Sequence, residues 1–294
     1  MKKLLPCLAA LFVASSCETK PPPPTNGNPP AVGAAVTVRG KRLPVEWVRT
    51  DPERIEALAE HRALSETGVL IAYDHERILY HHTGYNGPAC DIAWLNKSRK
   101  IFEIASLSGS DDEGVTSNGE GMYALALPPG WLKSTGAGVG DFVEFSSEIG
   151  APEPLSVVTV AGLPVHVEVS EYSRERMRGL MHRKRMSGHD GMLFIYKEAG
   201  SHSFWMSNCW FPLDIAYFDA SGKFVNMVPS AIYPNPKVDR EPTSPSAGDA
   251  KYVLEVNLGW FKAHKLLDDD LKPLKEIVLQ FGDDLKKLEE NADP

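Results

Sequence analysis

The sequence lacks several features that would place the protein in a common functional class. Beyond its first sixteen residues it has no apolar run that approaches the about 20 residues needed to span a bilayer. It has no cluster of lysine and arginine, and its formal net charge is −8. Nucleic acid and anionic lipid headgroups are therefore excluded as expected partners.

Metal-binding and nucleophilic motifs are also missing. The nine histidines are scattered, and neither HExxH nor CxxC occurs, so we expect no metal site, no cofactor and no catalytic residue. His182, His189 and His202 could gather near Cys209, but the repeat described below gives them no equivalents, and we interpret them as solvated. Cys209 as a nucleophile would need an adjacent histidine and an orienting group, and no such signature is present.

The N-terminus is typical of an export signal. Two lysines precede a short apolar stretch over 4–13, and small residues then lead to Cys17. This order resembles the bacterial lipobox, in which the cysteine is acylated and becomes the first mature residue. We therefore predict a signal peptide over 1–16 and a lipid anchor at Cys17. The alternative is an ordinary secretory signal that is cleaved near the same place.

A proline-rich segment follows the cysteine, and we predict a tether over 17–34. Proline fixes φ and removes a backbone donor, so prolines 21–24, 29 and 30 keep the segment out of sheets and helices. An extended spacer of this kind holds a globular body away from a surface. We expect a protein of the cell envelope whose partner is the membrane, through Cys17. Glu18 after the cysteine favours the periplasmic face of the outer membrane, if the envelope is Gram-negative.

An internal repeat organises the rest of the chain. Four blocks recur in the same order, and two of them recur at the same offset of 123 residues. The pairs are 36–46 with 158–168, 68–73 with 191–196, 91–93 with 214–216, and 130–133 with 259–262. We predict two tandem copies of one domain, over 35–148 and 156–275, joined by a glycine- and proline-containing linker.

Each copy predicts the same order of elements. A hairpin turns at Arg39-Gly40 in the first copy and at Ala161-Gly162 in the second. A short helix follows, capped by the Thr50–Glu53 box or by Ser170 or Ser173. In the second copy, strands are predicted over 192–196, 213–218, 223–228 and 252–256. The predicted fold class is mainly β (α+β), with two small barrel-like domains that each carry a short helix.

The C-terminal segment differs from the repeat. Six apolar residues recur at three- and four-residue spacing, namely Leu274, Ile277, Val278, Phe281, Leu285 and Leu288. This pattern predicts an amphipathic helix over 271–290. Its apolar face would pack against the protein's own barrels or, alternatively, bind a partner.

Family-like motifs are concentrated in the second copy. They are Gly179-Leu180-Met181-His182-Arg183, Gly191-Met192-Leu193-Phe194, Phe204–Ile215, and Glu255 with Gly259-Trp260. With these motifs the copy resembles the family called domain of unknown function 192, although it has Ser207 for the usual lysine and Cys209 for the usual threonine. The first copy keeps the order of the repeated blocks and Asp91 but has lost most of the motif residues. We therefore expect it to be a degenerate copy with a structural role. The resemblance implies a compact β-rich fold and often export, but no established activity.

Polar residues within these apolar motifs form the candidate ligand site. Arg183, Asn208 and Asp214 could converge in a small polar pocket, and aromatic faces with such polar groups suit sugar-like ligands. The rim of this pocket would be formed by Trp205, Met206, Trp210 and Phe211. The alternative is structural: Asp214 would pair with Arg183, and Asn208 would satisfy backbone groups of a turn.

Three function classes remain open at this stage. The leading hypothesis is a non-catalytic binding or interaction module for a small molecule or an envelope partner. The second is a hydrolase or isomerase that acts on an envelope small molecule or sugar through Asp214, which would require a raised carboxyl pKa. The third is a purely structural envelope protein.

Two cysteines remain in the body of the protein, and an oxidising compartment would allow them to pair. Cys90 and Cys209 lie in nearly equivalent loops of the two copies. They could form an interdomain disulfide if the copies pack about an axis that passes near those loops. The alternative is two separate buried thiols.

Overall fold

The structure, a computed structural model, describes residues 33–49, 54, 57–58, 64–84, 87–109, 113–232, 243–282, 285–288 and 292. The predicted signal peptide, Cys17 and almost all of the tether lie outside the described residues. The helix predicted from the Thr50–Glu53 box also begins outside them. None of the helices in the described ranges is both long and apolar enough to cross a membrane.

The first domain is a seven-stranded sheet with one short described helix, α2 (Trp131–Thr135). Its strands are β1 (Ala35–Val38), β2 (Lys41–Val48), β3 (Gly68–His81), β4 (Cys90–Leu95), β5 (Ile101–Leu107), β6 (Val115–Leu127) and β7 (Glu144–Phe145). In space the strands follow the order β5-β4-β6-β3-β2-β1-β7.

The second domain repeats this plan. Its large sheet contains β8 (Ser156–Val160), β9 (Leu163–Ser170), β10 (Asp190–Gly200), β12 (Leu213–Phe218), β13 (Phe224–Ser230), β15 (Ala250–Asn257) and β16 (Leu279–Phe281). A two-stranded ribbon is added by β11 (Ser203–Trp205) and β14 (Thr243–Pro245), and α3 (Ser173–Arg178) and α4 (Trp260–Ala263) are its helices. The strand order β13-β12-β15-β10-β9-β8-β16 matches that of the first domain position by position. The predicted internal repeat is therefore confirmed in the topology.

Local sequence explains the hairpins that open each domain. Arg39 and Gly40 have φ of 48° and 76°, and Ala161 and Gly162 have φ of 51° and 82°. Two successive residues with positive φ are the requirement of the two-residue turn whose twist suits a β-hairpin. Both predicted turns are confirmed. The cap predicted for the helix of the second copy was wrong, because Tyr172, and not Ser170 or Ser173, precedes the first helical residue of α3.

Each sheet closes on itself, which confirms the barrel-like prediction. In the first domain an isolated bridge joins Lys100, beside β5, to Phe142, beside β7. In the second, Lys223 and Val278 form the equivalent bridge. Apolar side chains then alternate between the two sides of each strand. In β10, Leu193 points into the barrel core, whereas Phe194 joins an outer apolar layer beneath the segment that includes Leu180 and Phe211.

The helix predicted over 271–290 was wrong for most of that segment. Residues 279–281 form β16, which pairs with β8, and only 285–288 are helical among the described residues. Ile277 and Leu279 are buried while Gln280 is exposed, which is the period-2 pattern of a strand. The spacing of three and four residues was compatible with a helix, but the second barrel needs this segment as its closing strand.

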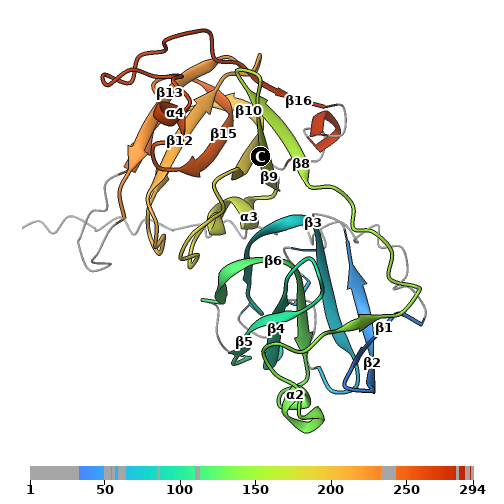
Figure 1. Cartoon of the computed structure of the whole chain (residues 1–294). Coiled ribbons are helices and arrows are strands. Elements are labelled where there is room, and N and C mark those ends of the chain that lie inside the picture. Colours follow the sequence, from blue (N-terminus) through green and yellow to red (C-terminus); the bar gives the residue numbers. More distant parts are fainter. Residues whose placement is uncertain are drawn as a thin grey trace, which may run out of the picture.

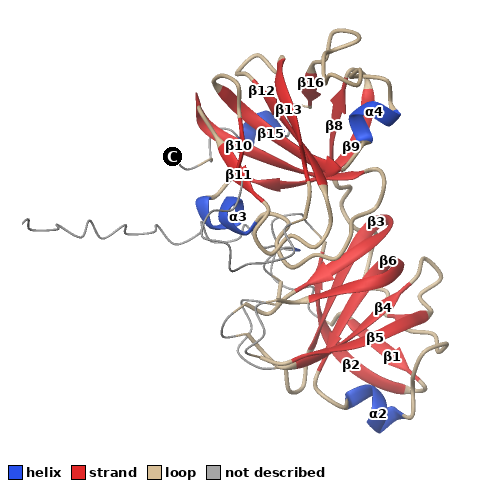
Figure 2. Cartoon of the chain, turned by 90° about the vertical axis from the view of Figure 1, so that its left-hand side faces the viewer, coloured by secondary structure: helices blue, strands red, loops and turns tan. Residues whose placement is uncertain are grey.

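The two domains pack directly against each other, one above the other in Figure 1 and with α3 at their boundary in Figures 1 and 2. The segment after Arg183 lies on β3 and β6 of the first domain. The hydroxyl of Ser187 accepts a hydrogen bond from the backbone N–H of Ile78 at 2.8 Å and donates one to Glu120 at 3.0 Å. The backbone N–H of Lys184 donates to Thr116 at 3.2 Å.

Candidate functional site

A row of side chains crosses the outer face of the second sheet and carries two carboxylates. Met192 of β10 pairs with Glu168 of β9 on one side and with Glu255 of β15 on the other. Paired residues on adjacent strands project from the same face. The side chain of Glu168 is 12% exposed, and Glu255 is buried. The outer face therefore holds two largely desolvated acids.

Two arginines from different domains meet Glu168. Arg183 binds it with both terminal nitrogens, Nη1 to Oε1 at 2.8 Å and Nη2 to Oε2 at 2.5 Å. Arg77, on β3 of the first domain, reaches the same Oε1 through Nη2 at 2.9 Å. The Nε of Arg77 lies 3.0 Å from Oδ2 of Asp190, and both side chains are almost fully buried. The first copy thus inserts a cation into the acidic face of the second.

The two glutamates respond to this environment in opposite ways. Burial by itself would raise the pKa of Glu168, but Arg183 and Arg77 outweigh burial and lower it to about 2. Burial raises the pKa of Glu255 to about 8, because the attraction of Arg183 offsets only part of the desolvation. Glu168 is therefore held as a carboxylate and Glu255 as a neutral acid near pH 7.

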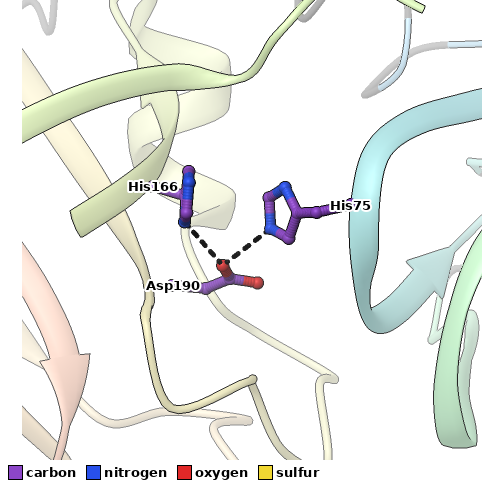
Figure 3. A group of neighbouring side chains, drawn as sticks. All are labelled: His75, His166 and Asp190. Carbon is purple, nitrogen blue, oxygen red and sulfur yellow. Dashed lines mark hydrogen bonds and ion pairs between the residues drawn. The ribbon is translucent and has the colours of Figure 1, made fainter. Parts of the chain in front are cut away.

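His75, His166 and Asp190 form a cluster beside this network (Figure 3). Nε2 of His75 and Nδ1 of His166 lie 3.4 Å and 4.0 Å from Oδ1 of Asp190. The hydrogen bond to Asp190 raises the pKa of His75. Burial lowers the pKa of His166, and the neighbouring His75 lowers it further. The cluster joins a residue of the first domain to two residues of the second.

The structure does not bring Arg183 and Asp214 together. Arg183 lies on the outer face with Glu168, whereas Asp214 is a buried residue at the base of α4. The carboxylate of Asp214 accepts a hydrogen bond from the backbone N–H of Phe261 at 3.2 Å. Burial raises the pKa of Asp214, and the backbone N–H groups around Trp260 counteract this. Asp214 presents no carboxylate to solvent for acid–base chemistry.

The repeat explains why both copies keep this aspartate. Asp91 in the first domain accepts a hydrogen bond from the backbone N–H of Gly130 at 2.7 Å, just before α2. Gly130 and Gly259 both have positive φ, 75° and 84°, at the start of the short helix. The aspartate and the Gly-Trp turn therefore recur together, because the carboxylate of the aspartate accepts a hydrogen bond from the backbone of the turn and holds the turn in place.

Of the predicted aromatic residues, Trp205 ends β11 and Trp210 lies in the loop that follows, which is held at several points. Trp205 is 54% exposed and Trp210 is 52% exposed, whereas Met206 between them is buried. The carbonyl of Asn208, a residue with φ of 55°, accepts a hydrogen bond from the backbone N–H of His182 at 2.7 Å. The side chain of Met206 is thus part of the outer apolar layer, while the two indoles face solvent.

The prediction of an interdomain disulfide was wrong. Cys90 and Cys209 are two separate buried thiols. Cys90 packs into an apolar cluster of the first domain, and Cys209 packs into the outer layer of the second. Burial raises the pKa of the Cys90 thiol to about 12, which keeps it protonated and unreactive.

The histidines predicted to be solvated differ among themselves. His189 is exposed, but His202 is half-buried, stacks on Tyr196 at a centroid distance of 3.6 Å and contacts the carbonyl oxygen of Ala250 through Nε2 at 2.9 Å. The sequence analysis missed the residues that do gather. The available signal was His166 and Glu168, which occupy alternate positions of an otherwise apolar strand and so share one face.

Comparison with known proteins identifies the domains by family. The model of the family DUF192, described as "Uncharacterized ACR", matches residues 34–145 and 156–271. No curated protein matches the chain.

Two solved structures are similar to parts of the chain. One is a protein of unknown function from Novosphingobium aromaticivorans DSM 12444, with 27% identity over 42% of this chain and 84% of that chain, at a TM-score of 0.36. The other, from Sinorhizobium meliloti 1021, is named "putative transcription regulator"; it has 17% identity over 68% of this chain and 98% of that chain, at a TM-score of 0.34.

Proposed function

Because the chain belongs to the DUF192 family, whose name assigns no activity, we propose a function from its own residues: a lipid-anchored, non-catalytic binding module of the cell envelope. Its second domain binds a sugar-like envelope ligand through Trp205 and Trp210. The observation that carries this proposal is the exposure of both indoles, at 54% and 52%, on the segment that runs from the end of β11 past the buried Met206 and Cys209.

A held loop makes exposed aromatic residues suitable for binding. Met206, Cys209 and Phe211 are buried around the two tryptophans, and the backbone N–H of Trp210 donates to the carbonyl of Arg183 at 3.3 Å. Binding then costs little side-chain and loop ordering, which is the main expense of association at a mobile surface. Indole rings combine a large apolar face with an N–H donor, and sugar rings present apolar C–H faces with hydroxyl groups at their edges.

The other two hypotheses receive less support from the site. A hydrolase or isomerase that uses Asp214 would need an accessible carboxyl group, and Asp214 is buried and hydrogen-bonded to backbone. A purely structural protein would have no use for two solvent-facing tryptophans on one fixed segment, although single exposed apolar residues are common.

The binding proposal predicts that replacing either tryptophan selectively weakens ligand binding. Soluble peptidoglycan fragments should quench the tryptophan fluorescence of the full chain in a saturable titration. Trp205→Ala or Trp210→Ala should weaken binding by about tenfold or more, since aromatic anchors dominate such contacts. Phe142→Ala is the matched control, because Phe142 is 60% exposed but lies in the first domain. Equal binding by all three variants, or none by the unmodified chain, would contradict the proposal.

The anchoring part of the proposal is tested separately. In bacteria that express the full chain, we expect the protein to fractionate with membranes and to accumulate unprocessed in the presence of globomycin, which inhibits lipoprotein signal peptidase. Cys17→Ala should abolish the membrane association. Cys7→Ala is the matched control, because Cys7 lies inside the predicted signal peptide. A fully soluble mature protein, unaffected by globomycin, would show that no lipid anchor forms.

A further inference from the structure

We propose that His75, His166 and Asp190 bind a divalent transition metal ion of the zinc class, in a site shared by the two domains. One ligand atom from each of the three residues lies within 4.8 Å of the other two. His75 belongs to the first domain, and the other two residues belong to the second. The site is therefore complete only when the two copies are docked.

The backbone fixes the positions of the three side chains. His166 of β9 is the register partner of Asp190 of β10 in a parallel ladder, so the two project from the same face. His75 lies where the pairing of β3 with β6 shifts register between Ala72 and Arg77. Such an irregularity redirects side chains out of the regular alternation. It directs His75 across the domain boundary toward Asp190 (Figure 3).

The distances are close to those of a coordination sphere. A zinc ion at about 2.0–2.1 Å from nitrogen and oxygen ligands holds tetrahedrally arranged ligand atoms about 3.3 Å apart. Nε2 of His75 is 3.4 Å from Oδ1 of Asp190, and Nδ1 of His166 is 4.0 Å from the same oxygen. Closing the site requires His166 to approach both Asp190 and His75, whose ligand atoms lie within 4.8 Å of its own. Its side chain is 34% exposed and so has room to move.

The surrounding groups orient the ligand atoms. Nδ1 of His75 is 2.8 Å from Oδ1 of Asp74, so a proton on Nδ1 leaves the lone pair of Nε2 directed at the site. The Nε of Arg77 pairs with Oδ2 of Asp190 and leaves Oδ1 for the ion. Nδ1 of His166 is buried and has no hydrogen-bond partner in the described part of the chain. As the neutral acceptor, this ring nitrogen would be satisfied by a metal ion.

The donor set selects the class of ion. Two imidazoles with one carboxylate suit zinc, nickel, cobalt or copper, whereas magnesium and calcium prefer oxygen ligands alone. Asp190 is buried, but the side chains of His75 and His166 are 28% and 34% exposed. An ion held there would link the two domains.

Titration of the untagged full chain, stripped with a chelator, tests the proposal. Isothermal calorimetry with Zn²⁺ should detect one site that depends on the cluster, and Co²⁺ should give a visible absorption band. His75→Ala and His166→Ala should each weaken Zn²⁺ binding at least tenfold and remove the Co²⁺ band. Because the ion links folded domains, Zn²⁺ should also raise the Tm of the unmodified chain by several degrees.

The matched control is His189→Ala. His189 is an exposed histidine next to Asp190 and is not a member of the cluster, so its removal should leave both the affinity and the spectrum unchanged. Circular dichroism confirms that each variant is folded, and Asp190→Asn serves as a further variant that keeps the side-chain volume. The proposal is overturned if the unmodified chain shows no cluster-dependent site, or if His75→Ala and His166→Ala bind Zn²⁺ as tightly as His189→Ala does.

Discussion

Arg77→Ala is expected to destabilise the protein by about 3–5 kcal/mol, because removing one partner of a buried ion pair leaves an uncompensated charge. The side chain of Arg77 is 2% exposed and that of its partner Asp190 is 1% exposed. Glu168 would keep Arg183, but Asp190 would lose its fully buried cation. Urea denaturation followed by tryptophan fluorescence measures the change in the free energy of unfolding.

Lys272→Ala is the matched control for Arg77. Lys272 and Asp270 form an ion pair at 3.7 Å whose side chains are 74% and 78% exposed. Solvent screens such a pair, so its loss should cost less than about 1 kcal/mol. Arg77→Met separates charge from volume, because it fills the same space without a cation, and it should be destabilised as well. If Arg77→Met is as stable as the unmodified chain, the interdomain network makes no net contribution to stability.

The repeat and the hairpins could be predicted from sequence because their signals are local. Arg39-Gly40 and Ala161-Gly162 each supply two residues that adopt positive φ, as the two-residue turn requires. The paired recurrence of Asp and Gly-Trp reflects a contact inside each domain, where the carboxylates of Asp91 and Asp214 hold the following turn. Local chemistry and short-range contacts repeat with the domain, so two copies reveal them.

The candidate site could not be predicted in the same way, because it joins the two copies. Arg77 and His75 come from the degenerate copy, while the carboxylates that they meet across the boundary, Asp190 and Glu168, lie in the second. Nothing in a repeat alignment indicates a contact between non-equivalent faces. The polar residues of the motifs were interpreted as one pocket, but Arg183 and Asp214 come from separate elements and have different partners. Strand alternation at His166 and Glu168 was the one local indication.

The C-terminal segment shows how tertiary structure overrides periodicity. Its apolar residues fit a helical spacing over 271–290, but Ile277 and Leu279 are also two apart and fit a strand. Short apolar runs are ambiguous in this way. The gap left between β13 and β8 in the second barrel decides the outcome, because a strand there satisfies the backbone groups of both edges.

Glu255→Gln is expected to remove a large pH dependence of stability. Burial raises the pKa of Glu255 from 4.5 to about 8. When the pH lies between these two values, the protein therefore takes up a proton as it folds. The contribution of the neutral acid is fully present below about pH 4.5 and is lost as pH rises to about 8, at about 1.4 kcal/mol per pH unit. Glutamine resembles the neutral acid and does not titrate. The variant should therefore match the unmodified chain near pH 5 and exceed its stability by about 4 kcal/mol near pH 8.

The comparison isolates Glu255 because its titratable neighbours do not change charge in this range. Arg183 stays protonated, and burial raises the pKa of both Tyr196 and Tyr217, so they remain neutral. Urea denaturation of both chains at intervals from pH 5 to 8 gives the difference in the free energy of unfolding. Glu66→Gln, at an exposed position, is the control: its difference from the unmodified chain in the free energy of unfolding should not change with pH over the same range. A flat difference for Glu255→Gln as well would mean that Glu255 is not held as a neutral acid in the folded protein.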